Sequence, residues 1–505
     1  MYRDIVAAIM LLVAAGFVLF CIYLYVVRRK YNHIPSPKGA TFIFGHLGEI
    51  QRERSKHGGE YPPDDLYLRW ASECGSLFAI FVLWHVYIIA FDPSDLEAVF
   101  MAPAYRKSKI TDMIFGQICG QRFLGKGLFT IRDYETWKPR RKMYDPAFNR
   151  GYLKSLTPMF GECVDKFLDK LKPLADGRTQ VPMKKHIHNA ALDVISKVAF
   201  ASDFRVECRH GKPLDSHNDG TGIESLVATT FTGVMKQLNY PFFQYLHPFE
   251  AKGYRKAVRA LRTIGKECIV KRIKSLDSGE KVPNDILTHI LKVASTNESA
   301  DIETLVDDFV TFYVAGQETT ANTLSFAVIL VHQYPEVLVR LLAEIDEVLG
   351  SRSSVTAEDL EKLRYTEQVI EETLRLHGPV GVTTRETPAE EVILSGYRVP
   401  GRTQLAAFTA AACRMPQHFD DPDMFKPARF DPENKRPSPF VYFPFGVGHR
   451  ACIGRHFAMM EAKLVLSRLL QTFHVALPSD YKICVVEHTT RQPPDDIMCT
   501  LQPRK

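Results

Sequence analysis

One stretch near the C-terminal end of the chain decides the fold: Phe445-Gly446-Val447-Gly448-His449-Arg450-Ala451-Cys452-Ile453-Gly454. The two glycines before the cysteine allow a tight turn that brings the backbone close to a flat ligand. Cys452 then opens an apolar, helix-like run over 457–469, where free backbone N–H groups and the positive helix end stabilise a thiolate. Phe445 can exclude water from the sulfur, and Arg450 can meet an anionic group. Such a thiolate suits the axial ligand of haem iron; the alternative is a buried free cysteine in a glycine-rich turn.

The composition is that of an ordinary globular protein. Of the 505 residues, 46% are hydrophobic and 24% are charged, which argues against a disordered, collagen-like or coiled-coil protein. The 64 Lys and Arg against 58 Asp and Glu leave a formal charge of +6, which gives no support to a nucleic-acid partner. The 10 cysteines are scattered without a C-x-x-C pair, so we expect reduced thiols rather than a disulfide scaffold or a zinc ribbon.

Residues 1–30 are expected to form an uncleaved signal anchor. The run 5–27 carries no charge and is long enough to cross a hydrocarbon core of about 30 Å. Arg28-Arg29-Lys30 follow it, which places the C-terminal side in the cytosol; the alternative is a signal peptide that is removed. The two prolines in 31–40 predict a stiff, extended spacer, and we expect 41–505 to form a single domain without repeats or linkers.

Hydrophobic periodicity predicts a mainly α-helical protein with small β-sheets. The longest helix is expected from Ile302 to about Gln333, and because it is apolar on nearly all sides it should pass through the core. Alternating patterns predict strands at 77–82 and 86–90, with short strands around 391–408 and near the C-terminus. Further helices are expected over roughly 155–175, 189–200, 222–238, 250–277 and 335–349.

The long helix carries a second motif, Ala315-Gly316-Gln317-Glu318-Thr319-Thr320. The small residues one turn before Thr319 leave room against the helix for a diatomic ligand. The Thr319 hydroxyl can bond the carbonyl one turn back and open the helix slightly. Glu318 beside it can conduct protons. The alternative is a kinked core helix with no chemical role.

Two further spacings are notable. Glu372 and Arg375 stand three residues apart on a predicted helix and share a face, where the common outcome is a solvated ion pair worth about 0–1 kcal/mol. Trp137 and Arg141 lie in a basic segment in which Pro139 should restrict where the helix begins. Taken alone, Arg141 is simply an exposed cation.

Together these four motifs resemble those of the cytochrome P450 family, and they occur in the family's order. In that family they are written W-x-x-x-R, A-G-x-[D/E]-T-[T/S], E-x-x-R and F-x-x-G-x-R-x-C-x-G. The stretches 284–288, 308–312 and 442–445 resemble cholesterol 24-hydroxylase within the family. The resemblance implies the P450 fold and a haem-thiolate monooxygenase that hydroxylates a lipophilic substrate, expected to be a sterol.

The resemblance also implies roles for individual residues. It implies haem b with Cys452 as the axial iron ligand, and further haem contacts from Trp137, Arg141, Arg385, Arg450, Phe445, Gly446 and Gly454. It implies catalytic roles for Thr319 and Glu318. It implies a structural group that holds the cysteine loop, formed by Glu372, Arg375 and Arg429. The substrate pocket is expected to be lined by Met113, Phe115, Phe231, Phe312, Ala315, Val380 and Val382.

The electrons must come from another protein, because the sequence has neither a dinucleotide-binding motif nor a flavin domain. The resemblance implies O2 and NADPH, the latter used through the flavoprotein NADPH-cytochrome P450 reductase. It also implies a single-pass protein of the endoplasmic reticulum membrane with its catalytic domain in the cytosol. A basic docking patch for the reductase is expected from Lys138, Arg140, Arg141, Lys142, Arg455 and Lys463. The aromatic stretch 240–246 either packs in the core or dips into the bilayer.

Two other functions stay open at this point. One is a haem-thiolate isomerase or dehydratase of lipid peroxides, which would need neither O2 nor a reductase; Glu318-Thr319 speaks against it. The other is a non-catalytic haem protein that binds or senses a ligand. A requirement for NADPH and reductase distinguishes the first from a monooxygenase, and NADPH consumption without an oxygenated product would favour the second.

Overall fold

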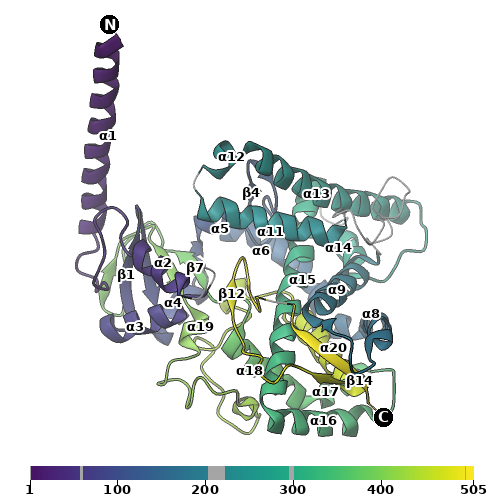
Figure 1. The fold of residues 1–505 in the computed structure, drawn as a ribbon. Helices are drawn as coiled ribbons and strands as arrows, with labels where there is room; N and C mark the ends of the chain where they lie inside the picture. The colour runs from purple at the N-terminus through teal and green to yellow at the C-terminus, as the bar shows by residue number, and fades with distance from the viewer. Residues whose placement is uncertain are drawn as a thin grey trace. The chain divides into compact units, whose positions relative to one another are not determined.

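The computed structural model describes residues 2–56, 61–202, 222–240, 242–294, 301–494 and 496–504 (Figure 1). The chain divides into two compact units that interleave along the sequence. The sheet unit comprises Met1–Ser108, Gly381–Pro422 and Ser438–Arg450. The helical unit comprises Lys109–Val380, Asp423–Pro437 and Ala451–Lys505. The expectation of a single domain over 41–505 stays a prediction.

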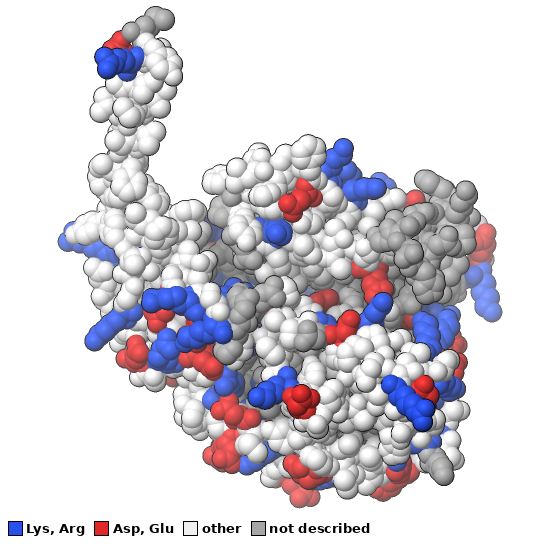
Figure 2. All heavy atoms as spheres, in the orientation of Figure 1, with Lys and Arg blue, Asp and Glu red and all other residues white. Residues whose placement is uncertain are grey.

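The N-terminal helix α1 (Tyr2–Arg29) has the length and composition of a membrane span. Its most apolar window has a mean hydropathy of 3.0 and is not buried by the rest of the protein. Figure 2 shows the middle of α1 as a surface without charge; charged side chains lie at its N-terminal tip, and Arg28 and Arg29 stand in its last turn. Because exposed apolar surface of this extent is costly in water, the helix is suited to a hydrocarbon environment.

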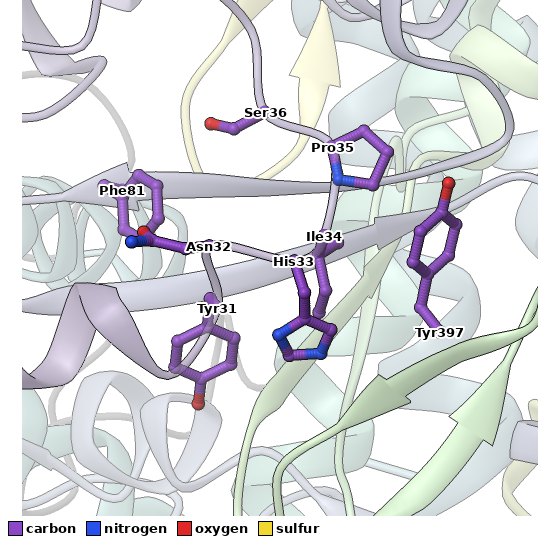
Figure 3. A pocket seen from close by; sticks show the side chains of 8 residues that line it. All are labelled: Tyr31, Asn32, His33, Ile34, Pro35, Ser36, Phe81 and Tyr397. Carbon is purple, nitrogen blue, oxygen red and sulfur yellow. The ribbon is translucent and has the colours of Figure 1, made fainter.

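The segment 31–40, expected to be a spacer, packs on the sheet unit instead. Tyr31 and Ile34 are buried, and the Tyr31 hydroxyl lies 2.8 Å from the Thr403 hydroxyl. The Pro35 carbonyl accepts a hydrogen bond of 2.8 Å from a strand amide. A hollow of about 460 Å³ lies beside this segment (Figure 3). Its walls are Tyr31, Asn32, His33, Ile34, Pro35, Ser36, Phe81 and Tyr397.

A five-stranded sheet forms the centre of the sheet unit. Its order is β1 (Leu77–Val82), β2 (His85–Ala90), β10 (Gln404–Ala407), β7 (Thr383–Glu386) and β3 (Arg106–Lys107). Strands β10 and β2 are parallel and the other neighbours are antiparallel. Successive residues of β1 enter two different apolar clusters, as a pleated strand covered on both faces requires. The remaining elements of this unit are α2 (Leu47–Ser55), α3 (Asp64–Cys74), α4 (Pro93–Met101), β8 (Val392–Leu394), β9 (Tyr397–Val399), α19 (Thr409–Ala412) and η5 (Gly448–Arg450).

The helical unit is built around α15 (Ile302–Gln333), which has the bounds that the periodicity predicts. Side chains from Leu305 to Val331 are buried almost throughout, with an interruption near the middle of the helix. Four helices contact it most extensively: α9 (Met183–Val194), α13 (Pro248–Asp277), α18 (Arg364–His377) and α20 (Arg455–Thr472). The mainly α fold with small sheets is thereby confirmed.

Shorter elements complete the helical unit. Its other helices are α5 (Lys109–Phe115), α6 (Tyr134–Tyr144), η1 (Asp145–Phe148), α7 (Arg150–Ser155), α8 (Thr157–Leu171), η2 (Lys172–Leu174), η3 (Ile195–Ala199), α11 (Ile223–Asn239), α12 (Phe243–Leu246), α14 (Ile286–Ala294), α16 (Pro335–Leu349), α17 (Ala357–Lys362) and η4 (Pro427–Phe430). Its strands are β4 (Gln117–Ile118), β5 (Gln121–Arg122), β6 (Val181–Pro182), β11 (Phe473–Ala476), β12 (Val486–Glu487), β13 (Arg491–Gln492) and β14 (Met498–Pro503).

Candidate active site

Cys452 lies three residues before the first residue of α20, close to the helix start that the sequence predicts, and the residue as a whole is exposed. Burial by the surrounding protein raises the pKa of its thiol, whereas the Gly454 amide and the charges of Arg141 and Arg455 lower it. Gly454 is the N-cap of α20, and its φ of −83° would suit other residues. It therefore acts on the sulfur through its backbone N–H. One N–H and two guanidinium groups favour the thiolate against the cost of burial.

Helix α6 brings Arg141 to the residue before the cysteine, with the Trp137 ring beside Arg141. The Asp133 side chain caps the helix by accepting the Thr136 amide at 2.9 Å. Arg141 Nη1 donates to the carbonyl of Ala451 at 2.7 Å, and its guanidinium carbon lies 5.9 Å from the centre of the buried Trp137 ring.

The proline in this helix does not set its start. The helix begins at Tyr134 and continues through Pro139, which forfeits one backbone hydrogen bond.

The sheet unit holds three cations close together: Lys107 of β3, Arg385 of β7 and Arg450. Burial and the positive charge of Arg450 lower the pKa of Arg385 to about 10. Burial lowers the pKa of Lys107 well below its usual range, and the charges of Arg385 and Arg450 lower it further. Mutual repulsion of buried cations makes this cluster a suitable place for an anionic group. No sequence pattern marks Lys107, because only the pairing of β3 with β7 sets it opposite Arg385.

The glycine turn before the cysteine needs its glycines. Gly446 and Gly448 have φ angles of 71° and 70°, which residues with a side chain rarely adopt. A Cβ atom on Gly448 would lie 2.1 Å from the Phe100 carbonyl oxygen, so the backbone could not approach this closely with any other residue. Phe445 is half-buried beside this turn. The tight turn predicted from the sequence is present.

The interruption in the burial of α15 coincides with the second motif. Ala315 is exposed, and Glu318 and Thr319 are half-buried, within a helix that is otherwise enclosed. The Thr319 hydroxyl donates to the Ala315 carbonyl at 2.8 Å, which is the bond expected one turn back. A Cβ atom on Gly316 would lie 2.9 Å from the Ile195 side chain, so this glycine allows close packing there.

The Glu318 carboxylate faces a hairpin that sequence reasoning did not connect with it. The Thr490 hydroxyl, in the turn between β12 and β13, donates to Glu318 Oε1 at 3.1 Å. Burial raises the pKa of Glu318, while Thr490, Asn322 and the charge of Lys184 lower it. Sequence patterns carry no signal for this contact, because the two residues are 172 positions apart.

The three residues of the predicted structural group are brought together. Glu372 and Arg375 are fully buried, and Arg375 donates to the carboxylate through Nε at 2.7 Å and Nη2 at 2.8 Å. Arg429 Nε donates to Glu372 Oε1 at 3.2 Å, and the Lys426 amide donates to the same oxygen at 2.8 Å. A solvated ion pair is therefore excluded for this spacing.

The predicted pocket residues are in different environments. Met113 and Val380 are exposed, and Phe115 and Phe231 are half-buried. Phe312 is buried, with its ring 5.1 Å from that of Tyr144 and 5.3 Å from that of Phe148, so it serves the core. Val382 lies in the sheet unit beside an apolar cluster.

The predicted basic docking patch is wrong at two of its residues. Arg140 forms an ion pair with the buried Asp308, and Lys463 is buried and donates to Glu367 at 2.9 Å. Both cations therefore form ion pairs with carboxylates within the helical unit. Exposed side chains remain at Lys138, Lys142 and Arg455.

A family model described as Cytochrome P450 matches residues 35–500. The chain belongs to the cytochrome P450 family. Cytochrome P450 4d2 of Drosophila melanogaster is 29% identical over 93% of this chain and 94% of its own length. Cytochrome P450 3A2 of Rattus norvegicus is 32% identical over 69% of this chain and 70% of its own length. The family consists of monooxygenase oxidoreductases that depend on haem and O2, and this chain is an enzyme of that class.

A solved structure supports the fold. The crystal structure of the cytochrome P450DA heme domain has a TM-score of 0.79 and 24% identity, covering 94% of this chain and 98% of that one. These relatives establish the P450 family and do not support the narrower likeness to cholesterol 24-hydroxylase.

Each unit, taken by itself, holds residues whose chemistry suits the haem that the family implies. The Cys452 thiol has an N–H donor and two cations near it that favour its anionic form. The cluster of Lys107, Arg385 and Arg450 has the charge that two carboxylate groups require. The exposed Ala315 offers a small side chain on a helix that is elsewhere enclosed.

Proposed function

We propose that the protein hydroxylates a lipophilic substrate with O2 and with electrons that reach it from NADPH through a membrane-bound flavoprotein reductase. The observation that carries the proposal is the setting of Cys452, where the Gly454 amide, Arg141 and Arg455 oppose the rise in the thiol pKa that burial causes. When bound, haem with a thiolate ligand supplies the reductive activation of O2 for attack on a C–H bond.

Cys452 is assigned as the haem ligand in the thiolate form. Its anion is stabilised by the amide at the start of α20 and by the two guanidinium groups nearby. The bond from Arg141 to the Ala451 carbonyl fixes the backbone next to the sulfur. Phe445, Gly446 and Gly454 are assigned to the same loop, whose positive φ at Gly446 supports a tight turn.

Cationic and N–H groups are assigned to the two haem carboxylates. On α6 these are Trp137 and Arg141, and in the sheet unit they are Arg385 and Arg450, to which Lys107 is added. Burial, together with the neighbouring positive charges, lowers the pKa of Lys107 and Arg385, and this pKa would rise when an anion binds, because opposite charge stabilises the protonated form. A bound carboxylate would thus stabilise the protonated form of each of these cations.

Glu318 and Thr319 are assigned to proton delivery. Cleavage of O2 consumes two protons, and a carboxylic acid beside an alcohol can supply them. Burial raises the pKa of Glu318, so its carboxyl retains a proton more readily than an exposed glutamate does. The Thr319 hydroxyl is oriented by its bond to the Ala315 carbonyl, which leaves its oxygen able to accept a hydrogen bond from a neighbour.

An exposed aromatic surface around α12 supports contact with a bilayer. Phe242 and Tyr245 are both 73% exposed, Leu246 is 71% exposed and Phe249 is 89% exposed. Figure 2 shows few charges over this part of the helical unit. Within the stretch 240–246, Phe243 is buried, so packing in the core is the environment of that residue. Position 241 lies outside the described residues. We assign this surface to the membrane interface, where a lipophilic substrate can enter.

The location proposed for the chain is the endoplasmic reticulum membrane, with α1 as a single span and the catalytic part in the cytosol. The apolar window of α1 and the basic run 28–30 after it support this orientation. A sterol is retained as one substrate class, on the basis of the subfamily resemblance alone.

The test uses the full chain in lipid nanodiscs with purified NADPH-cytochrome P450 reductase. Sterols and fatty acids are screened by the shift of the haem Soret band, and each binder is then incubated with NADPH. We expect an oxygenated product that requires both NADPH and reductase. Conversion of lipid hydroperoxides without either, and no oxygenation with both, would establish an isomerase or dehydratase instead. NADPH consumption without a product from any binder would favour a ligand-binding haem protein.

A further inference from the structure

A partly buried chain of hydrogen bonds ends on the Glu318 carboxylate. Gln317 Nε2 lies 3.1 Å from His188 Nδ1, and His188 Nε2 lies 3.0 Å from Asn322 Oδ1. Asn322 Nδ2 donates to the Thr490 hydroxyl at 3.0 Å, and that hydroxyl donates to Glu318 Oε1 at 3.1 Å. The chain links α9, α15 and the β12–β13 hairpin within the helical unit.

The donors in this chain all point the same way. Asn322 uses its amide N–H toward Thr490, so its carbonyl oxygen accepts from His188 Nε2. His188 Nδ1 then accepts from Gln317, which requires the neutral ring. Burial lowers the pKa of His188 to about 4, as does the charge of Lys184, so the ring is neutral at physiological pH. Each hydrogen bond polarises the next toward Glu318.

This arrangement orients a carboxyl group and does not carry protons along its length. The Asn322 amide stands between His188 and Thr490, and an amide N–H does not pass a proton on as water or a hydroxyl does. Gln317 Oε1, at the far end, is buried without a hydrogen-bond partner among the described residues. Protons therefore do not enter Glu318 from this side, and the chain acts on its position and proton affinity.

We propose that Thr490 is a positioning residue for Glu318, and that its hydroxyl, backed by Asn322 and neutral His188, fixes the orientation and proton affinity of this carboxyl. The inference rests on the proposed role of Glu318 in proton delivery, and it adds a control from a hairpin 172 positions away. The charged group that acts on Glu318 from α9 is Lys184, whose ammonium is held by the Pro493 carbonyl at 2.7 Å. Thr490 supplies the hydroxyl contact at 3.1 Å, and the Asn322 side chain also hydrogen-bonds the carboxyl.

The experiment compares Thr490→Val, which keeps the shape and removes the hydroxyl, with Thr490→Ser, which restores it. Thr472→Val is the matched control, because its hydroxyl bonds the Arg468 carbonyl at 2.8 Å and has no contact with Glu318. Infrared difference spectra of the holoenzyme follow the C=O band of the protonated carboxyl with pH, and Glu318→Gln assigns that band. In parallel, the product formed per NADPH is measured over the same pH range.

We expect Thr490→Val to move the Glu318 titration to higher pH, because a hydrogen bond to the charged form is lost. We also expect the product formed per NADPH to fall roughly tenfold, the factor that about 1.4 kcal/mol of lost charged hydrogen bonding corresponds to. Thr490→Ser should restore both, and Thr472→Val should change neither. His188→Leu breaks the hydrogen-bond chain at an earlier link and should shift the Glu318 titration in the same direction by a smaller amount. This variant provides the test if Thr490→Val does not fold.

The outcomes separate the two claims. An unchanged carboxyl titration in both Thr490→Val and His188→Leu would overturn the positioning role. If the titration shifts in Thr490→Val but Glu318→Gln forms the normal amount of product per NADPH, the positioning role is upheld and the assignment of Glu318 to proton delivery is refuted. A shift in Thr490→Val that Thr490→Ser does not reverse would also overturn the inference, because the hydroxyl would then not be its cause.

Discussion

The buried carboxylate of Glu372 gives a sharp test of how α18 is tied to the segment that carries Lys426 and Arg429. Glu372→Gln keeps the shape of the side chain and removes its charge. In the native protein this carboxylate accepts two hydrogen bonds from Arg375, one from Arg429 and one from the Lys426 amide, at 2.7–3.2 Å. The substitution leaves the Arg375 guanidinium fully buried without its counter-charge and replaces one acceptor oxygen by a donor.

The expected cost follows from burial. Breaking a buried ion pair by removing one partner costs about 3–5 kcal/mol, because the other charge stays desolvated. Glu361→Gln is the matched control, since Glu361 pairs with Arg150 and Lys154 at the surface and is 40% exposed. Exposed pairs contribute about 0–1 kcal/mol. The two variants should therefore differ by about 3 kcal/mol, which is a factor of more than about one hundred in an opening equilibrium.

The assay is hydrogen exchange of the amides of α18, read by mass spectrometry on the holoenzyme, with urea unfolding alongside. Exchange measures the local free energy of opening and does not assume that two compact units unfold together. We expect much faster exchange of α18 in Glu372→Gln and little change in Glu361→Gln. Equal effects of the two substitutions, within about 1 kcal/mol, would refute the reasoning.

Three further predictions concern other parts of the chain. Thr319→Ala should leave the thiolate spectrum intact and divert electrons to peroxide and water, measured as peroxide formed per NADPH, with Thr323→Val as the control. Glu461→Met should raise the free energy of unfolding by about 1–3 kcal/mol near pH 8 and by less near pH 5, measured by urea denaturation. Tyr245→Trp should show fluorescence that brominated lipids quench in nanodiscs, whereas Val339→Trp, at a site also exposed, should not; equal quenching would contradict the interfacial assignment of α12.

The sign of the Glu461 prediction comes from its surroundings. Both carboxyl oxygens are buried without a hydrogen-bond partner among the described residues, and burial raises the pKa well above its usual range. The native state therefore keeps the proton after the unfolded chain has lost it. As pH rises past the ordinary glutamate pKa, unfolding becomes progressively easier until the native pKa is reached. Methionine has no proton to lose, so its advantage grows with pH.

Local patterns located the elements that are regular over many residues. The bounds of α15 and the strands β1 and β2 follow from periodicity, because a fully enclosed helix and a covered sheet leave strong apolar patterns. The Thr319 contact one helical turn back was likewise predictable, since it depends only on helix geometry.

Contacts between distant segments were not predictable in the same way. Lys107 lies on a two-residue strand whose pairing with β7 is invisible in the sequence, and Thr490 reaches Glu318 from a hairpin near the C-terminus. The basic docking patch failed at Lys463 because α20 is enclosed on most sides, so a charge there must pair inside. The segment 31–40 became part of the sheet unit because Tyr31 and Ile34 are apolar enough to join its core.

The central claim is that the Cys452 thiolate is the haem ligand. The most direct measurement is the carbon monoxide difference spectrum of the reduced full-length protein, recorded for the wild type, Cys452→Ser and the control Cys484→Ser, whose cysteine is half-buried. The account predicts the thiolate-ligated Soret band in the wild type and in Cys484→Ser, and its loss in Cys452→Ser. A thiolate band that persists in Cys452→Ser would contradict it.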